Sequence, residues 1–195
     1  EFDKTFVYVT HNQDEAFTLA DRIGIMNDGR LVQVGAPTEV YRNPTNRFVE
    51  DFLGDTNFVA GEVTDVGDRH ARLSTAFDAT IRIPAFEAAD PGASFTVSLR
   101  PEFMRIRRAN GADTPEGTAA RADGTGGDTI TGTVENSIYR GSSIRYVVAV
   151  GGEQLFVEQS VTEQTGIEEG AEVELGWDTH NILVFHPDGS RARAE

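Results

Sequence analysis

The segment 5–26 is the feature that most constrains the fold, because it predicts a strand, a helix and a second strand in quick succession. Residues 6–9 are aromatic and β-branched, which predicts a buried strand. Asn12 can cap the helix that follows, and Glu15 stands where a capping-box carboxylate belongs. His11 is therefore expected just beyond the carboxyl end of a strand, the edge at which open α/β sheets bind ligands. Four apolar residues have the spacing of one helix face and are expected to lie against a sheet: Ala16, Leu19, Ala20 and Ile23.

The same segment resembles the switch-histidine region of ATP-binding cassette (ABC) ATPases. The similarity rests on Thr10 and His11 after an apolar strand, on Gln13, and on the motifs EA at 15–16 and LADRI at 19–23. It is specific to the importer branch, whose members energise the uptake of sugars, polyamines, iron or oxyanions. In that family the matching histidine contacts the γ-phosphate of ATP, so the resemblance implies a catalytic role for His11. Taken without its neighbours, a lone histidine at this position is more often an ordinary strand-end residue.

The charge of the chain is unusually negative. Its 195 residues include 32 aspartates and glutamates against 17 basic residues, for a formal net charge of -15, and Lys4 is the only lysine. The negative electrostatic potential of such a chain disfavours nucleic acids and anionic membrane surfaces as direct partners. The acidic, lysine-poor composition also resembles proteins adapted to a high-salt cytoplasm, where screening removes the repulsion between carboxylates. The alternative is a merely acidic bacterial protein.

Several kinds of site are excluded by what the sequence lacks. Without cysteine there are no disulfides or thiolate metal sites, and the four histidines are scattered. No apolar run approaches the roughly 20 residues that span a bilayer, and the N-terminus does not resemble a signal peptide. The sequence also has no Gly-rich phosphate loop, no apolar strand ending in Asp-Glu and no LSGGQ signature, which this ATPase family needs. We therefore expect ATP and magnesium to act only in the intact family member, and this chain to be inactive alone.

Residues 22–54 predict a hairpin followed by two helices. Two apolar runs flank Asp28 and Gly29, a strong hairpin signal because glycine adopts a positive φ at low cost. A helix is expected over 37–42, and Thr45 is expected to cap a second helix that ends at Gly54. This succession again resembles importer ATPases, in which it leads out of the catalytic domain. Residues 1–54 are therefore interpreted as the C-terminal remnant of the ABC ATPase domain. One face of the second helix is apolar: Phe48, Val49, Phe52 and Leu53.

From residue 55 onward the sequence changes to short alternating strands separated by Gly, Asp and Pro, which predicts a small barrel or sandwich. Weak internal similarity divides this half into two modules, about 55–108 and 129–187. The loop 109–128 between them is small, polar and Gly-rich, and we expect it to be mobile. The tail 188–195 is expected to be disordered for the same reason. The segments that echo one another are 59–63 with 130–134 and 92–100 with 170–178.

The β half resembles the oligonucleotide/oligosaccharide-type barrel, called TOBE, that is appended to importer ATPases. The match is carried by residues 98–106, by 132–141 and by 146–150. The spacing around 138–141, and the short interval between Trp177 and the strand at 182–185, is most similar to polyamine-importer ATPases, with iron and sugar importers close behind. The predicted fold class is therefore mixed: the C-terminal fragment of a P-loop ATPase α/β domain, followed by an all-β OB-like (TOBE) barrel domain.

Four residues of the β half are candidate regulatory or interface residues. Arg100 and Glu102 flank a proline at a strand end, where they could pair across a turn or a subunit boundary. An ordinary solvated pair is an equally good interpretation. Tyr139 and Arg140 precede a glycine and could form a contact surface, although a plain strand-end turn is the simpler interpretation.

The resemblance implies the C-terminal part of the ATP-binding subunit of an ABC importer, with polyamine cargo favoured. Such subunits form homodimers, bind membrane permease subunits and lie in the cytoplasm on the inner face of the cell membrane; no nucleic acid is expected as a partner. The alternative is a stand-alone TOBE-type module that binds a small oxyanion or other solute, or that acts only in dimerisation. Because the strand at 6–9 lacks its partner strands, we also expect residues 1–54 to be locally rearranged or packed against a second molecule.

Overall fold

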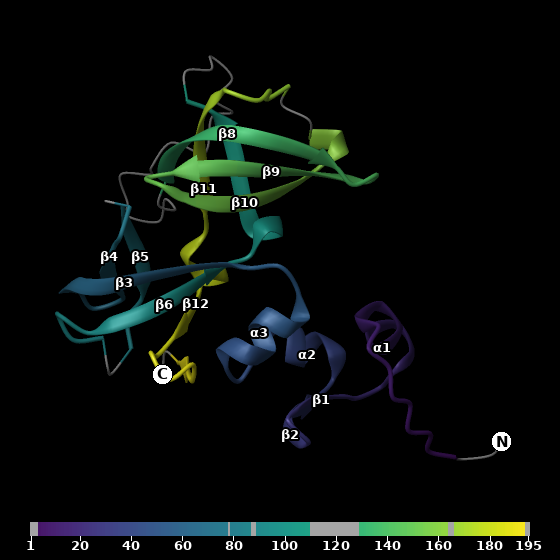
Figure 1. The fold of residues 1–195 in the computed structure, drawn as a ribbon. Coiled ribbons are helices and arrows are strands. Elements are labelled where there is room, and N and C mark those ends of the chain that lie inside the picture. Colours follow the sequence, from purple (N-terminus) through teal and green to yellow (C-terminus); the bar gives the residue numbers. More distant parts are fainter. Residues whose placement is uncertain (1–3, 78, 87–88, 110–128, 164–165, 194–195) are drawn as a thin grey trace. The chain divides into compact units, whose positions relative to one another are not determined.

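The computed structural model describes residues 4–77, 79–86, 89–109, 129–163 and 166–193 (Figure 1). The chain divides into two compact units, Glu1–Gly54 and Asp55–Glu195. Among the described residues, the first unit contains three short α-helices and a two-stranded hairpin, and the second unit is built mainly of antiparallel strands.

The first unit consists of α1 (Gln13–Leu19), β1 (Ile23–Asn27), β2 (Arg30–Gly35), α2 (Pro37–Arg42) and α3 (Arg47–Leu53). The predicted hairpin is confirmed, since β1 and β2 pair in antiparallel fashion. Asp28 and Gly29 adopt positive φ angles of 47° and 74°, as a two-residue hairpin turn requires. The hairpin and the helices share a small apolar core: Ile23, Ile25, Val40, Val49 and Leu53.

Residues 6–9 do not form the predicted strand. Their side chains are 85%, 90%, 68% and 90% exposed, and no strand of the described residues pairs with them. A strand needs a neighbour for its main-chain N–H and C=O groups, and the helices and the hairpin of this unit supply none here. The prediction that Leu19 lies against a sheet is also wrong, because its side chain is 74% exposed.

The helix caps agree only in part with those predicted from the sequence. Asn12 caps α1 as predicted, with its Oδ1 accepting a hydrogen bond from the Glu15 N–H at 3.4 Å. The capping box does not close, because the Asn12 N–H donates to the hydroxyl of Thr10 at 2.9 Å. The cap of α3 is Asn46 and not Thr45: the Asn46 side chain accepts from the N–H three residues on, at 2.9 Å, which is the usual N-cap geometry.

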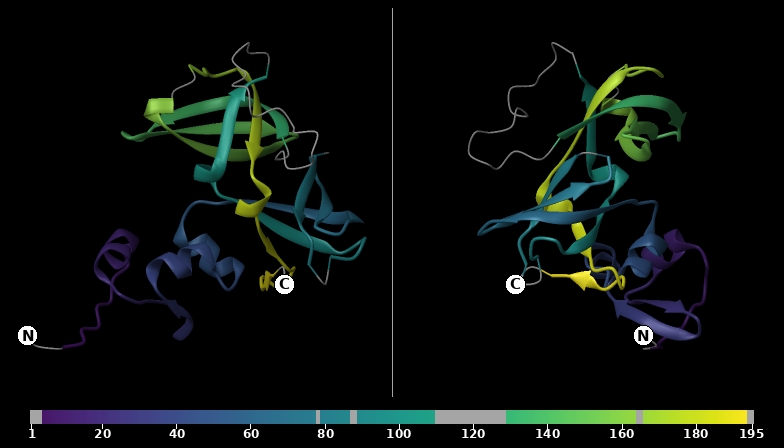
Figure 2. Two further views of the ribbon diagram at one scale, coloured as in Figure 1. Left: turned by 180° about the vertical axis from the view of Figure 1, so that it is seen from behind. Right: turned by 60° about the vertical axis from the view of Figure 1, so that its left-hand side comes forward.

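The described residues of the second unit form two antiparallel sheets (Figures 1 and 2). The β3 sheet has the strand order β13-β12-β6-β3-β4-β5, and the β8 sheet has the order β10-β9-β8-β11-β7. Both sheets are curled and line one continuous apolar core, which confirms the predicted OB-like β architecture. The strands of the β3 sheet are β3 (Asn57–Val66), β4 (His70–Thr75), β5 (Thr80–Pro84), β6 (Ser94–Leu99), β12 (Leu183–Phe185) and β13 (Arg191–Ala192). Those of the β8 sheet are β7 (Met104–Arg108), β8 (Thr129–Tyr139), β9 (Ser143–Val150), β10 (Glu153–Ser160) and β11 (Glu172–Trp177). In the described part of this unit, strands are also connected by the 3-10 helices η1 (Pro101–Phe103), η2 (Val161–Glu163) and η3 (Thr179–Asn181).

Each half of this unit contributes to the other sheet: the first half gives β7 to the β8 sheet, and the second gives β12 and β13 to the β3 sheet. β7 follows β6 in the sequence but pairs with β11 of the β8 sheet, with Ile106 opposite Leu175. In the same way β12 follows β11 but pairs with β6 of the β3 sheet, with Val184 opposite Val97. The short helices η1 and η3 make the two crossovers. Because the last strands are exchanged, the two segments that the sequence distinguishes are interlocked and do not form two separate cores.

A structural repeat accompanies the exchange, centred on Gly61 and Gly132. Two residues beyond each glycine, Val63 exchanges main-chain hydrogen bonds of 2.8 and 2.9 Å with residues 92–93, and Val134 exchanges bonds of 2.8 and 3.0 Å with residues 170–171. A Cβ at Gly61 or Gly132 would lie 2.4 or 2.6 Å from a main-chain carbonyl oxygen of the adjacent strand. Glycine therefore lets neighbouring strands approach closely at the same point of both halves.

The C-terminal residues correct the expectation of a disordered tail. Arg191–Ala192 form β13, which pairs with β12, and Ala192 is buried in the core. The preceding turn is closed by the Asp188 carboxylate, which accepts hydrogen bonds from the N–H and the hydroxyl of Ser190 at 2.8 and 2.6 Å. A local side-chain bond of this kind orders a polar segment that buries little apolar surface. The predicted mobile loop 109–128 lies, except for Ala109, outside the described residues.

Candidate functional site

His11 is exposed and directly precedes Asn12, the N-cap of α1. The helix is tied to α3, because the Gln13 side-chain amide donates to the main-chain carbonyl of Phe52. The structure therefore places His11 at the start of a helix, as the sequence predicts. The expected strand before it is missing, so His11 does not stand at a sheet edge within this chain.

The residues around His11 do not fit a nucleotide by themselves. The Glu15 carboxylate accepts hydrogen bonds from the hydroxyls of Thr10 and Tyr8, at 3.0 and 3.2 Å, so the first turn of α1 carries a negative charge close to the histidine. That charge opposes a phosphate group, and the sequence has no phosphate-loop motif of the form GxxxxGK[ST], whose main-chain N–H groups could cradle one. ATP and magnesium would need residues that this chain does not contain.

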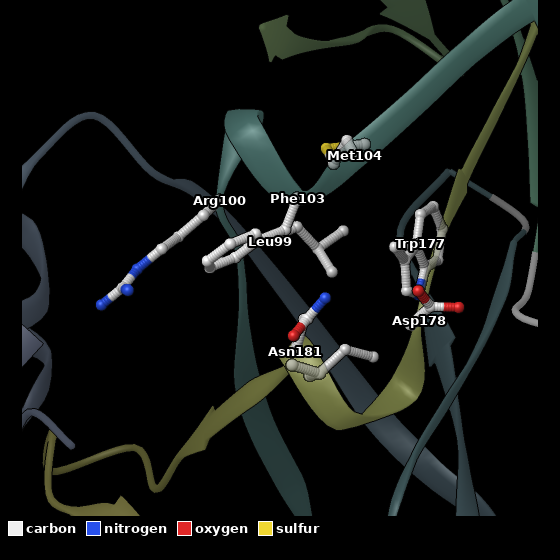
Figure 3. Close-up of a pocket in the computed structure, with 8 residues that line it drawn as sticks. Leu99, Arg100, Phe103, Met104, Trp177, Asp178 and Asn181 are labelled. Carbon is white, nitrogen blue, oxygen red and sulfur yellow. The ribbon is translucent and has the colours of Figure 1, made fainter. Parts of the chain in front are cut away.

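A shallow pocket lies at the two crossovers of the second unit (Figure 3). The space between its side chains is too small to hold a water molecule, so it is the packed centre of the strand exchange and not a ligand cavity. The indole Nε1 of Trp177 is buried and has no acceptor among the described residues. The pocket is lined by residues around η1 and by residues with the same spacing around η3: Leu99, Arg100, Phe103 and Met104, with Trp177, Asp178, Asn181 and Ile182.

The four predicted regulatory residues lie at two different places. Arg100 and Glu102 lie at η1; Arg100 is buried, with its guanidinium directed away from Trp177 in Figure 3, and Glu102 is exposed. Tyr139 and Arg140 lie at the turn between β8 and β9, where Tyr139 is 60% exposed. The sequence analysis treats these four residues as one set, but in the fold each pair lies at a different turn between strands.

Arg140 takes part in a charge network that the sequence does not indicate. Arg145, on β9, donates to the carboxylate of Asp55 and, at 2.9 Å, to that of Glu158. Arg140 Nη1 lies 3.9 Å from the same oxygen of Asp55. The Ser143 hydroxyl donates to the second Glu158 oxygen at 2.7 Å. The network joins the beginning of the second unit to its β9–β10 hairpin.

The network favours the ionised forms of Glu158 and Arg145. The hydrogen bond from Ser143 lowers the pKa of Glu158; burial opposes this shift, and the bond from Arg145 adds to it. Burial would lower the pKa of Arg145, but the hydrogen bonds to Asp55 and Glu158 together raise it. The guanidinium also lies 5.8 Å from the centroid of the Phe156 ring, where the ring face stabilises a cation. The network therefore acts through its geometry and not through proton transfer.

Asn57 makes a second connection between the two sheets. This buried residue opens β3, and its Nδ2 donates to the carbonyl oxygens of Leu99 and Phe156 at 2.9 and 2.8 Å. Its Oδ1 accepts from the Phe156 N–H at 2.7 Å. Phe156 lies on β10, the edge strand of the β8 sheet, so Asn57 satisfies main-chain groups that an edge strand leaves open. Sequence reasoning missed this residue, because an asparagine between loop and strand is ordinarily a turn residue.

The arginines of β7 are engaged with neighbouring groups. Arg105 makes two hydrogen bonds to Asp178, at 3.0 and 3.1 Å, and Arg107 makes one to Glu174 at 2.7 Å. These bonds lower the pKa of both carboxyl groups, against the opposing effect of burial. Arg108 donates to a main-chain carbonyl at 2.8 Å. These arginines therefore form a neutralised strand edge and not an open anion site.

Comparison with known proteins shows which protein family this chain is related to. Residues 97–185 match the family described as TOBE domain, so the second unit carries a TOBE domain. The chain is also similar to spermidine/putrescine import ATP-binding proteins (PotA): 33% identical over 93% of its length to that of Rubrobacter xylanophilus, and 34% over 95% to that of Acidothermus cellulolyticus. The protein of Thermotoga maritima is 32% identical over 95% of the chain. The chain is therefore a homologue of the ATP-binding subunits of ABC importers, as its motifs indicate.

These alignments cover 45%, 46% and 47% of the three relatives, so the chain spans about half the length of the curated relatives it matches. Among solved structures, the cytoplasmic molybdate-binding protein ModG, crystallised with molybdate bound, superposes on 67% of this chain and 96% of its own, with a TM-score of 0.55 and 14% identity. This likeness shows a shared fold. Within the described part of the chain, no helix is long and apolar enough to cross a membrane. The same residues include no group of carboxylate and imidazole side chains that could hold a metal ion.

Proposed function

We propose that this chain forms the C-terminal part of the ATP-binding subunit of an ABC importer. The observation that carries the proposal is that similarity to import ATP-binding proteins covers 93% to 95% of the chain and therefore includes most of the first unit. A free-standing β module would align through its second unit only. Residues 1–54 would complete the ATPase domain, and residues 55–187 would form the TOBE-type domain. By the family resemblance, His11 would contact a γ-phosphate that is bound mainly by residues outside this chain.

The exposed apolar surface of the first unit supports this role. Met26, Leu31 and Val34 are exposed on one face of the hairpin, and a Cβ added to Gly24 would lie 3.0 Å from Leu31, so this face is continuous. The opposite face packs into the small core through Ile23 and its neighbours. A hairpin that is apolar on both faces belongs inside a layered domain, where each face is covered. The remainder of an ATPase domain would supply that cover, and would also pair with residues 6–9.

The second unit would then act as the regulatory and dimerisation domain of the importer. A second ATPase subunit and membrane permease subunits are the proposed partners, on the cytoplasmic face of the membrane. Arg100, Glu102, Tyr139 and Arg140 are the proposed regulatory or interface residues. Polyamine is favoured as the cargo because the relatives compared above are named as spermidine and putrescine importers.

A chimera tests this function. The aligned region of the Rubrobacter xylanophilus protein is replaced by this chain, and ATP hydrolysis is measured with and without His11→Ala. We expect the chimera to hydrolyse ATP and the substitution to lower kcat about a hundredfold or more, the usual scale for a group that assists proton transfer or charge stabilisation. His180→Ala, in η3, is the matched control and should leave kcat unchanged. A folded chimera that hydrolyses ATP equally well with and without His11 would contradict the proposal.

The alternative function is a stand-alone module that binds a small oxyanion or other solute, or that acts only in dimerisation. The fold shared with a molybdate-bound protein favours it. The pairing of Arg105 and Arg107 with carboxylates weighs against an anion site on β7. A rise in the unfolding temperature of this chain with molybdate or sulfate would support solute binding, because a ligand that binds only the folded state stabilises it. No shift with either anion would leave the importer function as the better account.

A further inference from the structure

The second unit holds its own first residues at two points. Asp55 follows Gly54, the last residue of the first unit, and its carboxylate accepts a hydrogen bond from Arg145 on β9. Two residues further on, Asn57 bonds both main-chain polar groups of Phe156 on β10. The strand β3, which Asn57 opens, belongs to the β3 sheet, whereas β9 and β10 belong to the β8 sheet. The segment 55–57 therefore bonds to the β8 sheet, although the strand that it begins belongs to the β3 sheet.

In the contact between Asp55 and Arg145, the two side chains differ in how strongly the surrounding structure holds them in place. The Arg145 side chain is only 10% exposed, and Glu158, its Cα partner across the β9–β10 pair, holds its Nη2 at 2.9 Å. The Asp55 side chain is 60% exposed, and Arg140 lies 3.9 Å from the oxygen that Arg145 bonds. A hydrogen bond between ionised groups is stronger than a neutral one, and an immobilised guanidinium loses little further entropy when it forms. The β9–β10 hairpin therefore sets the position of Asp55, and not the reverse.

We propose that Asp55, Asn57 and Arg145 form a clamp through which the β9–β10 hairpin fixes the point where the chain leaves the first unit, with Arg145 as its positioning residue. A shift of this hairpin moves residues 55–57 with it, because both fastenings are on its strands. A rearrangement in the β8 sheet thus reaches the boundary between the units.

Removal of the Asp55 carboxylate in the full chain tests the clamp. Asp55→Ala is expected to raise amide hydrogen exchange in peptides spanning residues 54–57 about tenfold, the effect of losing one hydrogen bond between charged groups. Since Asp55 is exposed, the variant is expected to fold.

Asp178→Ala is the matched control. It also removes a carboxylate that bonds an arginine, but Asp178 precedes η3 and its partner Arg105 lies on β7, not at the boundary. The exchange at 54–57 should not change in this control. Arg145→Lys keeps the charge but loses the planar fork that bonds two carboxylates, and it should reproduce the effect of Asp55→Ala. The clamp is refuted if Asp55→Ala leaves the exchange at 54–57 at the parent value, or if Asp178→Ala raises it equally.

Discussion

Asn57 bonds both main-chain polar groups of Phe156, a residue 99 positions further along the chain. The pair joins the start of β3 to β10, which lie in different sheets. Because β10 is an edge strand, the N–H and C=O groups that face away from β9 are otherwise available to water or to another chain. One buried side chain therefore closes part of an exposed edge and connects the two sheets.

Replacing Asn57 with alanine should destabilise the second unit by about 2–4 kcal/mol, because Phe156 loses both of its partners in a partly buried place. Urea denaturation, followed by the fluorescence of Trp177, measures the change in the free energy of unfolding. Asn136→Ala, at an exposed position of β8, is the control and should change it by less than about 0.5 kcal/mol. An Asn57→Ala variant as stable as this control would show that the connection contributes nothing.

The charge network predicts a loss of stability in acid. The pKa of Glu158 is lowered from its ordinary value of 4.5 by Ser143 and Arg145. Its folded pKa therefore lies below the unfolded one, so this contribution to stability is present above pH 4.5 and is lost as the pH falls from there through the folded pKa. Urea midpoints measured across this range should fall less steeply for Glu158→Gln than for the parent chain. Glu153→Gln, at the exposed start of β10, should keep the parent slope; equal slopes in all three proteins would contradict the prediction.

The close approach of strands at Gly132 predicts that a methyl group is not tolerated there. In Gly132→Ala the new Cβ would lie 2.6 Å from the Ala149 carbonyl oxygen and 2.7 Å from a methyl carbon of Val148. Since a strand must move, we expect a loss of about 1–3 kcal/mol in the free energy of unfolding. Gly54→Ala is the control, because its Cβ would meet open space and its φ of 166° is extended. Equal stability of the two variants would show that the contact at Gly132 relaxes freely.

The strand exchange predicts that a cut between the two halves leaves them together. A protease site is inserted within residues 110–128, and the cleaved chain is examined by size-exclusion chromatography. We expect the fragments to co-elute in native buffer and to separate in urea, because β7 and β12 each pair with a sheet formed by the other fragment. Fragments that separate without denaturant would contradict the observed pairing.

The acidic composition predicts that salt stabilises the chain. With a formal net charge of -15, repulsion between carboxylates is expected to fall as counterions screen it. The unfolding temperature should rise between low salt and multimolar KCl, as measured by circular dichroism. A temperature that stays constant or falls would argue against adaptation to a high-salt cytoplasm and favour a merely acidic protein.

Features that depend on neighbouring residues could be predicted from the sequence. Asp28 and Gly29 specify the hairpin turn by their conformational preferences, and Pro37 marks the start of α2 in the same way. The alternation of apolar residues indicates the strands of the second unit, and the TOBE match confirms the family of that region. The position of His11 directly before a helix follows from the capping residue Asn12, although its catalytic role stays a prediction.

Features that depend on distant partners could not be predicted. Residues 6–9 have every local property of a buried strand, but pairing decides whether a strand forms, and no partner is present among the described residues. Asn57 and Arg145 act through partners 99 and 90 positions away, which periodicity does not show. The exchange of β7 and β12 likewise preserves the alternating pattern of each strand, so the sequence alone does not show which sheet receives it.

The central claim is that this chain supplies His11 to an ATPase without containing a nucleotide site of its own. Calorimetric titration of ATP and magnesium into the chain in multimolar KCl, beside the same titration into the chimera, tests that claim most directly. The account predicts no heat of binding for the chain alone and saturable binding by the chimera. Saturable binding by the chain alone that disappears in His11→Ala would show that it builds a nucleotide site by itself, and would contradict the account.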